Sequence, residues 1–201
     1  MAYDNGVNVA LVVFAYLIGS IPVGVVLGKM KGVDPRKTGS GNIGATNVMR
    51  AGGKVLGIVT LLADTAKGFI PVAVAGALGA GELVISSVGL AVFLGHVFPV
   101  FLRFRGGKGV ATALGVYIAV RPSVILAAFI IFVIVFMIWR YVSLASIIGA
   151  VIVPIGLYIV KAPCTFVVMA GIIGLIAIIR HKDNISRLIK GTENKLSFKK
   201  S

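Results

Sequence analysis

Long apolar runs, separated by short connections rich in Lys and Arg, constrain the fold of this chain more than any other feature. About 20 apolar residues suffice to cross the ~30 Å hydrocarbon core of a bilayer as a helix. With 58% hydrophobic and 13% charged residues, the chain is too apolar for a soluble domain. The sequence therefore predicts an all-α fold, a polytopic transmembrane helical bundle of about seven membrane helices, as a single domain over residues 1–201. The expected segments are roughly 7–28, 55–78, 82–102, 109–120, 123–139, 144–160 and 163–180.

One of these segments is short. A helix over residues 109–120 rises only about 18 Å, which fits a half-span or a re-entrant piece and leaves five or six full spans open. A short amphipathic helix is expected at about 42–50, at the membrane interface. The first segment lacks a basic n-region and a cleavage pattern, so we expect it to be kept as a membrane helix.

The distribution of charge predicts orientation and partners. Alternating the segments places 17 of the 20 Lys and Arg residues on one side, which the positive-inside rule makes cytoplasmic, with the N-terminus outside and the C-terminus inside. The net charge of +14 lies in short membrane loops. Anionic lipids or an anionic substrate are therefore expected as partners, and nucleic acid is not. A single cysteine, Cys164, excludes a disulfide framework or a thiolate metal site.

The first basic connection combines turn formers with polar side chains. Gly39, Gly41 and Gly44 match G-x-G-x-x-G, but the dinucleotide motif requires a preceding strand, which is not expected here. Glycines nevertheless let backbone N–H groups approach an anion, and a helix starting near Asn42 would direct its positive end there. Arg50 adds a guanidinium suited to bidentate phosphate contact. The alternative is a flexible loop of turn formers.

The second basic connection reads Gly106-Gly107-Lys108-Gly109 and opens a helix. This pattern is typical of an anion cradle with an added point charge. It is not a Walker A motif, because the required first glycine and the Ser or Thr after the lysine are missing. His96 precedes this connection, near the end of an apolar segment. Two roles stay open for His96, a hydrogen bond between helices or catalysis.

Ionisable and polar residues also occur within or just beyond other segments. Asp64 and Lys67 lie one turn apart inside the second expected span, where an ion pair supporting the site is favoured over direct catalysis. Ser143 lies in the third basic connection, immediately before the sixth apolar segment, and Asn184 and Arg187 lie one turn apart after the last segment. These positions place further polar groups on the side expected to be cytoplasmic.

Several chemical signatures are missing from the sequence. It contains no H-E-x-x-H, no Cys/His cluster, no carboxylate pair suited to acid–base work and no G-x-S-x-G elbow. The acyltransferase pattern of His, four residues and Asp also fails, because Phe101 and Ser186 occupy the Asp positions. We therefore expect neither a metal nor a cofactor.

Together these motifs resemble the bacterial PlsY family of integral membrane glycerol-3-phosphate acyltransferases, which use acyl phosphate. The resemblance extends over nearly the whole chain and rests on Gly19–Pro22, Gly39–Asn47, the Asp64/Lys67 segment, Gly95–Gly109, Arg140–Ser143 and Arg180–Ile185. It implies transfer of a fatty acyl group from acyl phosphate to the sn-1 hydroxyl of glycerol-3-phosphate. The products would be lysophosphatidic acid and inorganic phosphate, in the first step of bacterial phospholipid synthesis. It further implies a multi-pass protein of the bacterial cytoplasmic (inner) membrane, with its active site facing the cytoplasm and no acyl-CoA, acyl-carrier protein or metal.

On this basis the residues are given expected roles. The catalytic residues are expected to be His96, Ser40 and Lys108. His96 would orient or deprotonate the attacking hydroxyl, unless a substrate phosphate takes that proton. Substrate phosphate is expected to be bound by Ser40, Asn42, Arg50, Lys108, Ser143 and Asn184. The acyl-phosphate loop comprises Gly106, Gly107 and Gly109, whose backbone amides would approach that group. Supporting roles are expected for Asp64, Lys67, Thr46, Asn47, Arg140, His181, Arg187 and Glu193. We expect these residues to form one site in a monomer, with glycerol-3-phosphate, acyl phosphate and membrane lipids as partners.

Two other classes of protein fit part of the sequence. A transporter for an anionic metabolite would also need polar groups in a helical bundle, but no inverted repeat is visible and the polar residues gather at one face. A non-catalytic membrane subunit that holds anionic lipid would explain the charge. It would leave the Gly-Ser-Asn motif and the intramembrane Asp64 and Lys67 without a purpose.

Overall fold

The structure is a computed structural model that describes residues 5–196. Within this range the regular elements are all helical, and the chain divides after Val120 into two compact units. The all-α prediction is confirmed. The prediction that residues 1–201 act as a single domain stays a prediction.

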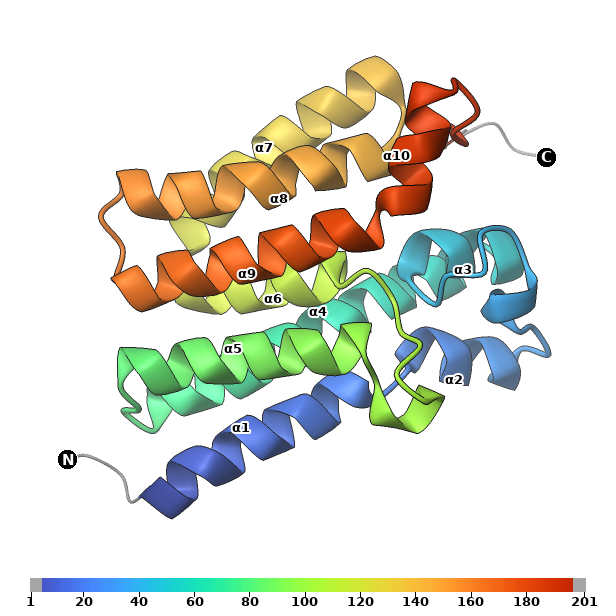
Figure 1. Ribbon diagram of the computed structural model, residues 1–201. Coiled ribbons are helices and arrows are strands. Elements are labelled where there is room, and N and C mark those ends of the chain that lie inside the picture. The colour runs from blue at the N-terminus through green and yellow to red at the C-terminus, as the bar shows by residue number, and fades with distance from the viewer. Residues whose placement is uncertain (1–4, 197–201) are drawn as a thin grey trace. The chain divides into compact units, whose positions relative to one another are not determined.

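The first unit is built around two long helices, α4 and α5. Helix α5 packs along α1, and α4 packs along α6, while α4 and α5 also contact each other (Figure 1). The elements are α1 Asn5–Ser20, α2 Val23–Met30, η1 Pro35–Lys37, α3 Ala45–Gly52, α4 Lys54–Ala77, α5 Glu82–Val97, η2 Val100–Leu102 and α6 Val110–Val120.

Glycines allow these helix pairs to approach closely. Gly19 of α1 and Gly95 of α5 each face a main-chain carbonyl oxygen of the other helix, and an added Cβ would overlap that oxygen. Gly68 of α4 and Gly115 of α6 are related in the same way. Small residues at such crossings are typical of membrane helices, because lipid gives no hydrophobic drive and close packing must hold the helices together.

The first expected span is broken. Residues 7–28 were expected as one helix, but α1 ends at Ser20 and α2 begins at Val23. Pro22 explains the break, because proline lacks an N–H and disfavours helical backbone at the residue before it. Together, Asn5–Met30 remain long and apolar enough for a membrane span.

The interfacial helix also differs from its expected bounds of about 42–50. Helix α3 covers Ala45–Gly52, with Gly44 as its N-cap. Asn42 lies outside the helix because its side-chain oxygen accepts a hydrogen bond from the Gly44 N–H at 3.1 Å, a local turn that competes with helix. The helix therefore begins at Ala45 and not near Asn42, so its positive end lies about three residues later in the chain than expected.

The second unit contains four helices, in which α8 packs against both α7 and α9. They are α7 Pro122–Trp139, α8 Val142–Ile159, α9 Cys164–Arg180 and α10 Lys182–Ile189. Pro122 occupies the start of α7, where its missing N–H has no cost. The last two helices bend by 57° at His181.

Among the described residues, five segments are long and apolar enough to cross a membrane, or six if α9 and α10 count as one bent span. The expected segment 109–120 forms α6, an apolar helix of only 11 residues. This is the short segment that the sequence singled out. The predicted orientation of the termini stays a prediction.

Candidate active site

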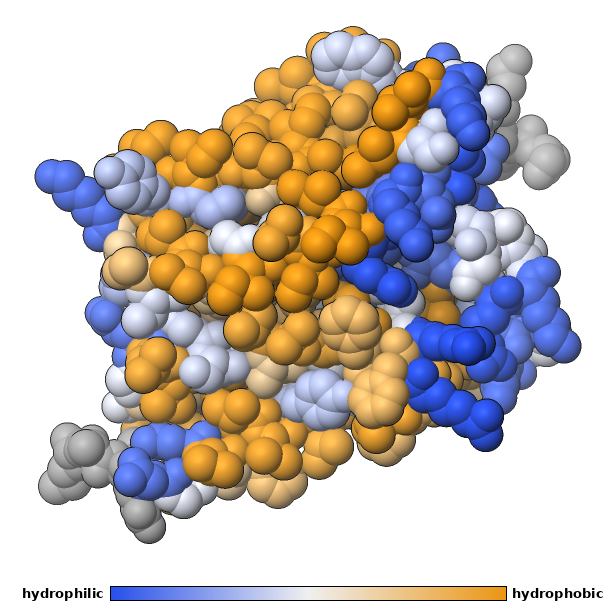
Figure 2. All heavy atoms as spheres, viewed as in Figure 1, coloured by the Kyte–Doolittle hydropathy of each residue, from blue (hydrophilic) through white to orange (hydrophobic). Residues whose placement is uncertain are grey.

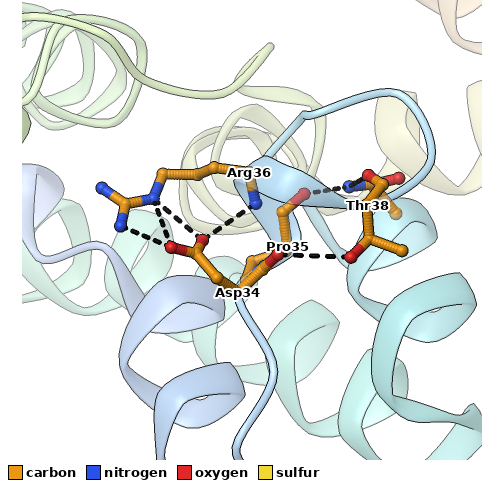
Figure 3. A network of polar contacts seen from close by, with 5 residues as sticks. Asp34, Pro35, Arg36 and Thr38 are labelled. Atoms are coloured by element: carbon orange, nitrogen blue, oxygen red, sulfur yellow. Dashed lines mark hydrogen bonds and ion pairs between the residues drawn. The ribbon is translucent and has the colours of Figure 1, made fainter.

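The loop before α3 begins with a compact ion pair (Figure 3). The Arg36 guanidinium donates to both carboxylate oxygens of Asp34, with Nη2 2.6 Å from Oδ2 and Nε 2.9 Å from Oδ1. The backbone N–H of Arg36 donates to the same carboxylate at 3.0 Å. The hydrogen bond from the Arg36 side chain holds the pKa of the Asp34 carboxyl well below its usual range. Arg36 is thus engaged within the loop.

Asn47 organises the rest of this loop from the first turns of α3. Its side-chain amide donates to the carbonyl oxygens of Pro35, Thr38 and Asn42, at 2.7, 3.0 and 2.8 Å. Its side-chain oxygen accepts the backbone N–H of Ser40 at 2.9 Å. Asn47 is only 3% exposed. One buried amide therefore fixes the backbone over eight residues.

This arrangement determines what the loop can offer to an anion. The Ser40 N–H is already donated to Asn47, so the hydroxyl and not the amide is the group that Ser40 can present. Gly39 and Gly41 adopt positive φ angles of 57° and 69°, which glycine reaches without steric cost. Ser40 and Arg50 are exposed, whereas Thr46 is half-buried in α3. The expected amide cradle is therefore not present at Ser40.

A buried polar cluster lies inside the helices of the first unit. Lys67 and Asp64 of α4 form an ion pair, with Nζ 2.8 Å from Oδ1, and their side chains are 7% and 2% exposed. Lys67 also donates to the Ile21 carbonyl at 3.0 Å, at the break between α1 and α2. The His96 Nδ1 of α5 lies 3.6 Å from the Asp64 carboxylate. The cluster thus joins three helical segments.

Sequence reasoning gave no role to Ile21. Its carbonyl sits where the helix is interrupted, so it lacks the helical partner that a continuous segment would supply. Pro22 was the available signal, because a proline inside an apolar span interrupts the helix, and carbonyls at the break need other donors. The Val23 N–H donates to the Ile21 carbonyl at 3.0 Å, and Lys67 is the second donor to this oxygen.

The glycine-rich loop packs directly on the end of α5. The N–H groups of Gly106 and Gly107 donate to the carbonyls of Val97 and His96, at 3.2 and 3.1 Å. A Cβ on Gly107 would overlap the Nε2 atom of His96. These two amides therefore do not form the expected open cradle for acyl phosphate; the glycines serve close packing on His96. Lys108 follows, half-buried.

In the second unit, the Glu193 carboxylate accepts hydrogen bonds from three residues to which the sequence analysis gave roles: Ser143, Asn184 and Arg187. Its Oε1 accepts hydrogen bonds from the Ser143 hydroxyl at 2.7 Å and the Asn184 amide at 2.6 Å. Its Oε2 accepts from Arg187 Nε at 2.7 Å. The Glu193 side chain is 7% exposed. The hydroxyl proton of Ser143 is thus committed to a protein carboxylate, so the expected contact of Ser143 with phosphate is not matched here.

The end of α10 brings Glu193 to this position. Gly191 has a φ of 69°, its N–H donates to the Leu188 carbonyl at 3.2 Å, and the Thr192 N–H donates to the Arg187 carbonyl at 2.8 Å. This is a Schellman motif, which ends a helix and turns the chain back. Glu193 therefore returns along the helical face that carries Asn184 and Arg187, one turn apart.

The surroundings of Glu193 keep it ionised. Burial acts to raise the pKa of its carboxyl, but the hydrogen bonds from Asn184, Ser143 and Arg187, with the Arg187 charge, lower that pKa below its usual value. A carboxylate that accepts several hydrogen bonds is stabilised in its charged form. Glu193 is accordingly an anion at neutral pH.

Two further residues expected to support the site, His181 and Arg140, make hydrogen-bond contacts that involve main-chain atoms. His181 is buried at the bend between α9 and α10, and its Nδ1 lies 2.7 Å from the Ala177 carbonyl. Arg140 is exposed with a φ of 62°, and its carbonyl accepts the Leu196 N–H at 3.0 Å. The predicted residues therefore form two groups, one in each unit. The expectation that both groups act on the same substrate stays a prediction.

Fold and site define the class: a polytopic helical membrane protein whose charged groups form a few fixed polar clusters in and beside its helices. The family model described as glycerol-3-phosphate acyltransferase matches residues 9–191. The chain belongs to this family, as the resemblance to PlsY predicted. Among the described residues, no group of three or more His, Cys, Asp or Glu side chains is placed to hold a metal ion.

Curated relatives and solved structures agree with this assignment. The chain is 52% identical to the glycerol-3-phosphate acyltransferase of Geotalea daltonii, over 93% of this chain and 96% of the relative. It is 50% identical to that of Aquifex aeolicus, over 92% and 97%. A crystal structure of PlsY, an integral membrane glycerol 3-phosphate acyltransferase in its glycerol 3-phosphate form, superposes with a TM-score of 0.92 and 48% identity, covering 94% and 96% of the two chains. The lysophosphatidic acid form gives 0.89 and 47%, covering 94% and 95%.

Proposed function

We propose that this protein transfers a fatty acyl group from acyl phosphate to the sn-1 hydroxyl of glycerol-3-phosphate. One observation carries the proposal: the chain matches, at 48% identity over 94% of its length, a PlsY structure in its glycerol 3-phosphate form. The related structure in the lysophosphatidic acid form supports the same product. We place the protein in the bacterial inner membrane as a monomer, with its active site toward the cytoplasm and without metal or cofactor.

The reaction needs positioning more than a strong protein nucleophile. The glycerol-3-phosphate hydroxyl oxygen attacks the acyl carbon, a new ester bond forms, and the acyl–phosphate bond breaks with release of inorganic phosphate. The hydroxyl proton passes to a base, and the leaving phosphate takes the bonding electrons. Acyl phosphate is already activated, so orientation and charge neutralisation supply much of the acceleration.

Ser40, Arg50 and Lys108 bind substrate phosphate in this proposal. Asn47 supports Ser40 directly, through a hydrogen bond of 2.9 Å to its backbone. Arg50 lies one turn after Asn47 in α3 and is exposed. Asn47 therefore links the Ser40 hydroxyl to the helix that carries the Arg50 guanidinium, which suits bidentate phosphate contact.

His96 is the candidate base, and its surroundings decide which nitrogen could act. Nδ1 faces the Asp64 carboxylate at 3.6 Å, which favours a proton on Nδ1. Nε2 then carries the lone pair, and it faces Gly107 of the glycine-rich loop. If a phosphate oxygen of the substrate is the base instead, His96 only holds the loop. The pH–rate profiles of His96→Ala and His96→Gln separate these roles, since near-normal turnover in both excludes an essential base.

The test of the reaction uses purified protein in proteoliposomes with palmitoyl phosphate and labelled glycerol-3-phosphate. We expect equal amounts of lysophosphatidic acid and inorganic phosphate, and 1-acyl product by NMR. Parallel reactions receive palmitoyl-CoA or palmitoyl-acyl-carrier protein in place of the phosphate. Product formed only from these donors would contradict the acyl-phosphate assignment, and a 2-acyl initial product would contradict the sn-1 assignment. Uptake of glycerol-3-phosphate without product would favour a transporter.

A matched pair of arginine variants tests the phosphate site. Arg50→Lys keeps the charge but loses the bidentate geometry, so kcat/KM should fall. Arg36→Lys is the control, because Arg36 is engaged with Asp34 and should tolerate the change. Kinetics for Arg50→Lys equal to those of the unaltered protein would mean that the proposed phosphate contact is wrong.

A further inference from the structure

The segment between α5 and the glycine-rich loop, Phe98 to Arg105, exposes aromatic side chains beside arginines. Phe101 and Phe104 are 60% and 59% exposed, and Arg103 and Arg105 are exposed as well. We call this segment the aromatic–arginine turn. In Figure 2, hydrophobic and hydrophilic residues adjoin each other in the region that η2 occupies in Figure 1. Two large apolar rings and two cations thus lie within the five residues 101–105 of one short turn, with Leu102 after the first ring.

The backbone of the turn is held in an uncommon conformation. Arg103 and Phe104 have φ angles of 52° and 62°, a left-handed conformation in which bulky residues are outliers. The turn is closed by hydrogen bonds from the Phe104 N–H to the Pro99 carbonyl at 2.9 Å and from the Tyr16 hydroxyl to the Phe98 carbonyl at 2.8 Å. The rings are therefore exposed on a braced turn, and not on a loose loop that could fold them inward.

The two arginines have no carboxylate partner in the described part of the chain. The printed sequence contains no Asp or Glu from Leu83 to Lys182, and the ion pairs among the described residues involve other cations. The chain carries 20 Lys and Arg residues but six Asp and Glu residues. Within the described residues no carboxylate neutralises Arg103 or Arg105, so these two exposed guanidinium groups can bind an anion from outside the protein.

The chemistry of the turn specifies that partner. Phe side chains of a basic segment at the membrane surface are buried at the boundary between headgroups and acyl chains, and guanidinium groups form strong, often bidentate, hydrogen bonds with phosphate. Basic residues beside a membrane are attracted to anionic lipid. Rings and cations that lie together within five residues match a molecule in which a phosphate and an acyl chain adjoin.

We propose that the aromatic–arginine turn is a docking site for the headgroup of an anionic glycerophospholipid. Arg103 and Arg105 bind the lipid phosphate while Phe101 and Phe104 enter the upper acyl region. The turn runs directly into Gly106, whose N–H is bonded to the Val97 carbonyl at 3.2 Å. Lipid docking thereby holds the glycine-rich loop at headgroup depth. The inference does not depend on the proposed reaction.

Tryptophan quenching by brominated lipid tests the site. The reporter is Phe101→Trp in a Trp139→Phe background, reconstituted in phosphatidylcholine bilayers that contain an equal fraction of brominated phosphatidylglycerol or brominated phosphatidylcholine. We expect brominated phosphatidylglycerol to quench at least twofold more strongly. In the Arg103→Gln/Arg105→Gln variant the two lipids should quench equally. Ile130→Trp, on the exposed side of α7, gives the baseline for non-selective lipid contact, with a ratio near one.

A second charge variant separates site-specific from general attraction. Lys29→Gln/Lys31→Gln removes the same charge from exposed positions at the end of α2 and should leave the quenching ratio unchanged. Equal quenching in the unaltered reporter, quenching by neither lipid, or a ratio that survives loss of both arginines would each overturn the proposal. If the two lipids quench the reporter equally and Arg103→Gln/Arg105→Gln raises the KM for acyl phosphate, the turn is a substrate contact and not a lipid site.

Discussion

Replacing Asn47 with Ala should uncouple the Ser40 loop from α3. The change removes the three hydrogen bonds that the side-chain amide donates to loop carbonyls and the one that its oxygen accepts from Ser40. Each net bond contributes about 1 kcal/mol, and part of the loss is recovered when freed carbonyls of an exposed loop meet water, leaving about 2–3 kcal/mol. That free energy corresponds to roughly a 30- to 150-fold decrease in the equilibrium constant for ordering of the loop, which is also the largest possible decrease in the ordered population.

If substrate binds only the ordered loop, its apparent affinity falls with that population. The kcat/KM for glycerol-3-phosphate acylation should therefore fall by up to this factor, while the protein remains folded in detergent. The conservative variant Asn47→Asp keeps the acceptor for Ser40 but places a carboxylate oxygen among three carbonyl oxygens. It should lose at least as much activity as Asn47→Ala.

The assay combines kinetics with a direct probe of the loop. Thr38→Cys in a Cys164→Ser background reports loop opening through its rate of maleimide labelling, which should rise in Asn47→Ala. Asp34→Asn is the matched control in the same loop, because it breaks the ion pair to an exposed Arg36, and exposed pairs contribute little. Unchanged kinetics and labelling in Asn47→Ala would refute the reasoning.

Three further changes test other parts of the structure. Lys67→Met leaves the buried Asp64 carboxylate without its ion-pair partner and should cost about 3–5 kcal/mol, with partial recovery on adding Asp64→Asn, as measured by thermal unfolding in detergent. Gly107→Ala pushes a methyl group into the α5 imidazole and should lower kcat/KM by about tenfold or more, whereas Gly171→Ala, with open space around it, should not. Because the Glu193 pKa is lowered on folding, its contribution to stability is present above the ordinary value of about 4.3 and is lost as pH falls through the lowered pKa. The melting temperature should therefore drop over this range in the unaltered protein, and Glu193→Gln should start lower at pH 7 and lack this drop.

Much of the fold could be predicted from local sequence patterns, such as the length of an apolar run or the spacing of two charged residues. Apolar runs of sufficient length identify the spans because an unsatisfied backbone cannot cross lipid. The three-residue spacing of Asp64 and Lys67 indicates an ion pair, which the structure contains at 2.8 Å. Short helices were less well bounded, since the difference between Asn42 and Ala45 as the start of α3 depends on one side-chain hydrogen bond.

The polar contacts were less accessible to sequence reasoning. An asparagine can donate and accept, and nothing local shows that Asn47 would use both functions within one loop. Glu193 and Ser143 are 50 residues apart, so their contact depends on helix packing and on the turn at Gly191. The glycines at 106 and 107 matched an anion cradle, but their N–H groups are used by carbonyls at the end of α5. A sequence pattern therefore indicates which hydrogen-bonding groups a segment carries, but it does not indicate which residues they bind in the folded protein.

The contact between Lys67 and the Ile21 carbonyl has a consequence for how the protein is made. A lysine in a membrane segment is costly until it is paired, and Asp64 lies one turn away in the same helix. The pair can therefore form within α4 at the moment of insertion. The Ile21 carbonyl and His96 belong to other segments, so their contacts arise only when helices assemble. Lys67 would thus first pair with Asp64, which lowers the cost of inserting α4 into the bilayer. It would later donate to the Ile21 carbonyl and hold the break between α1 and α2 against α4.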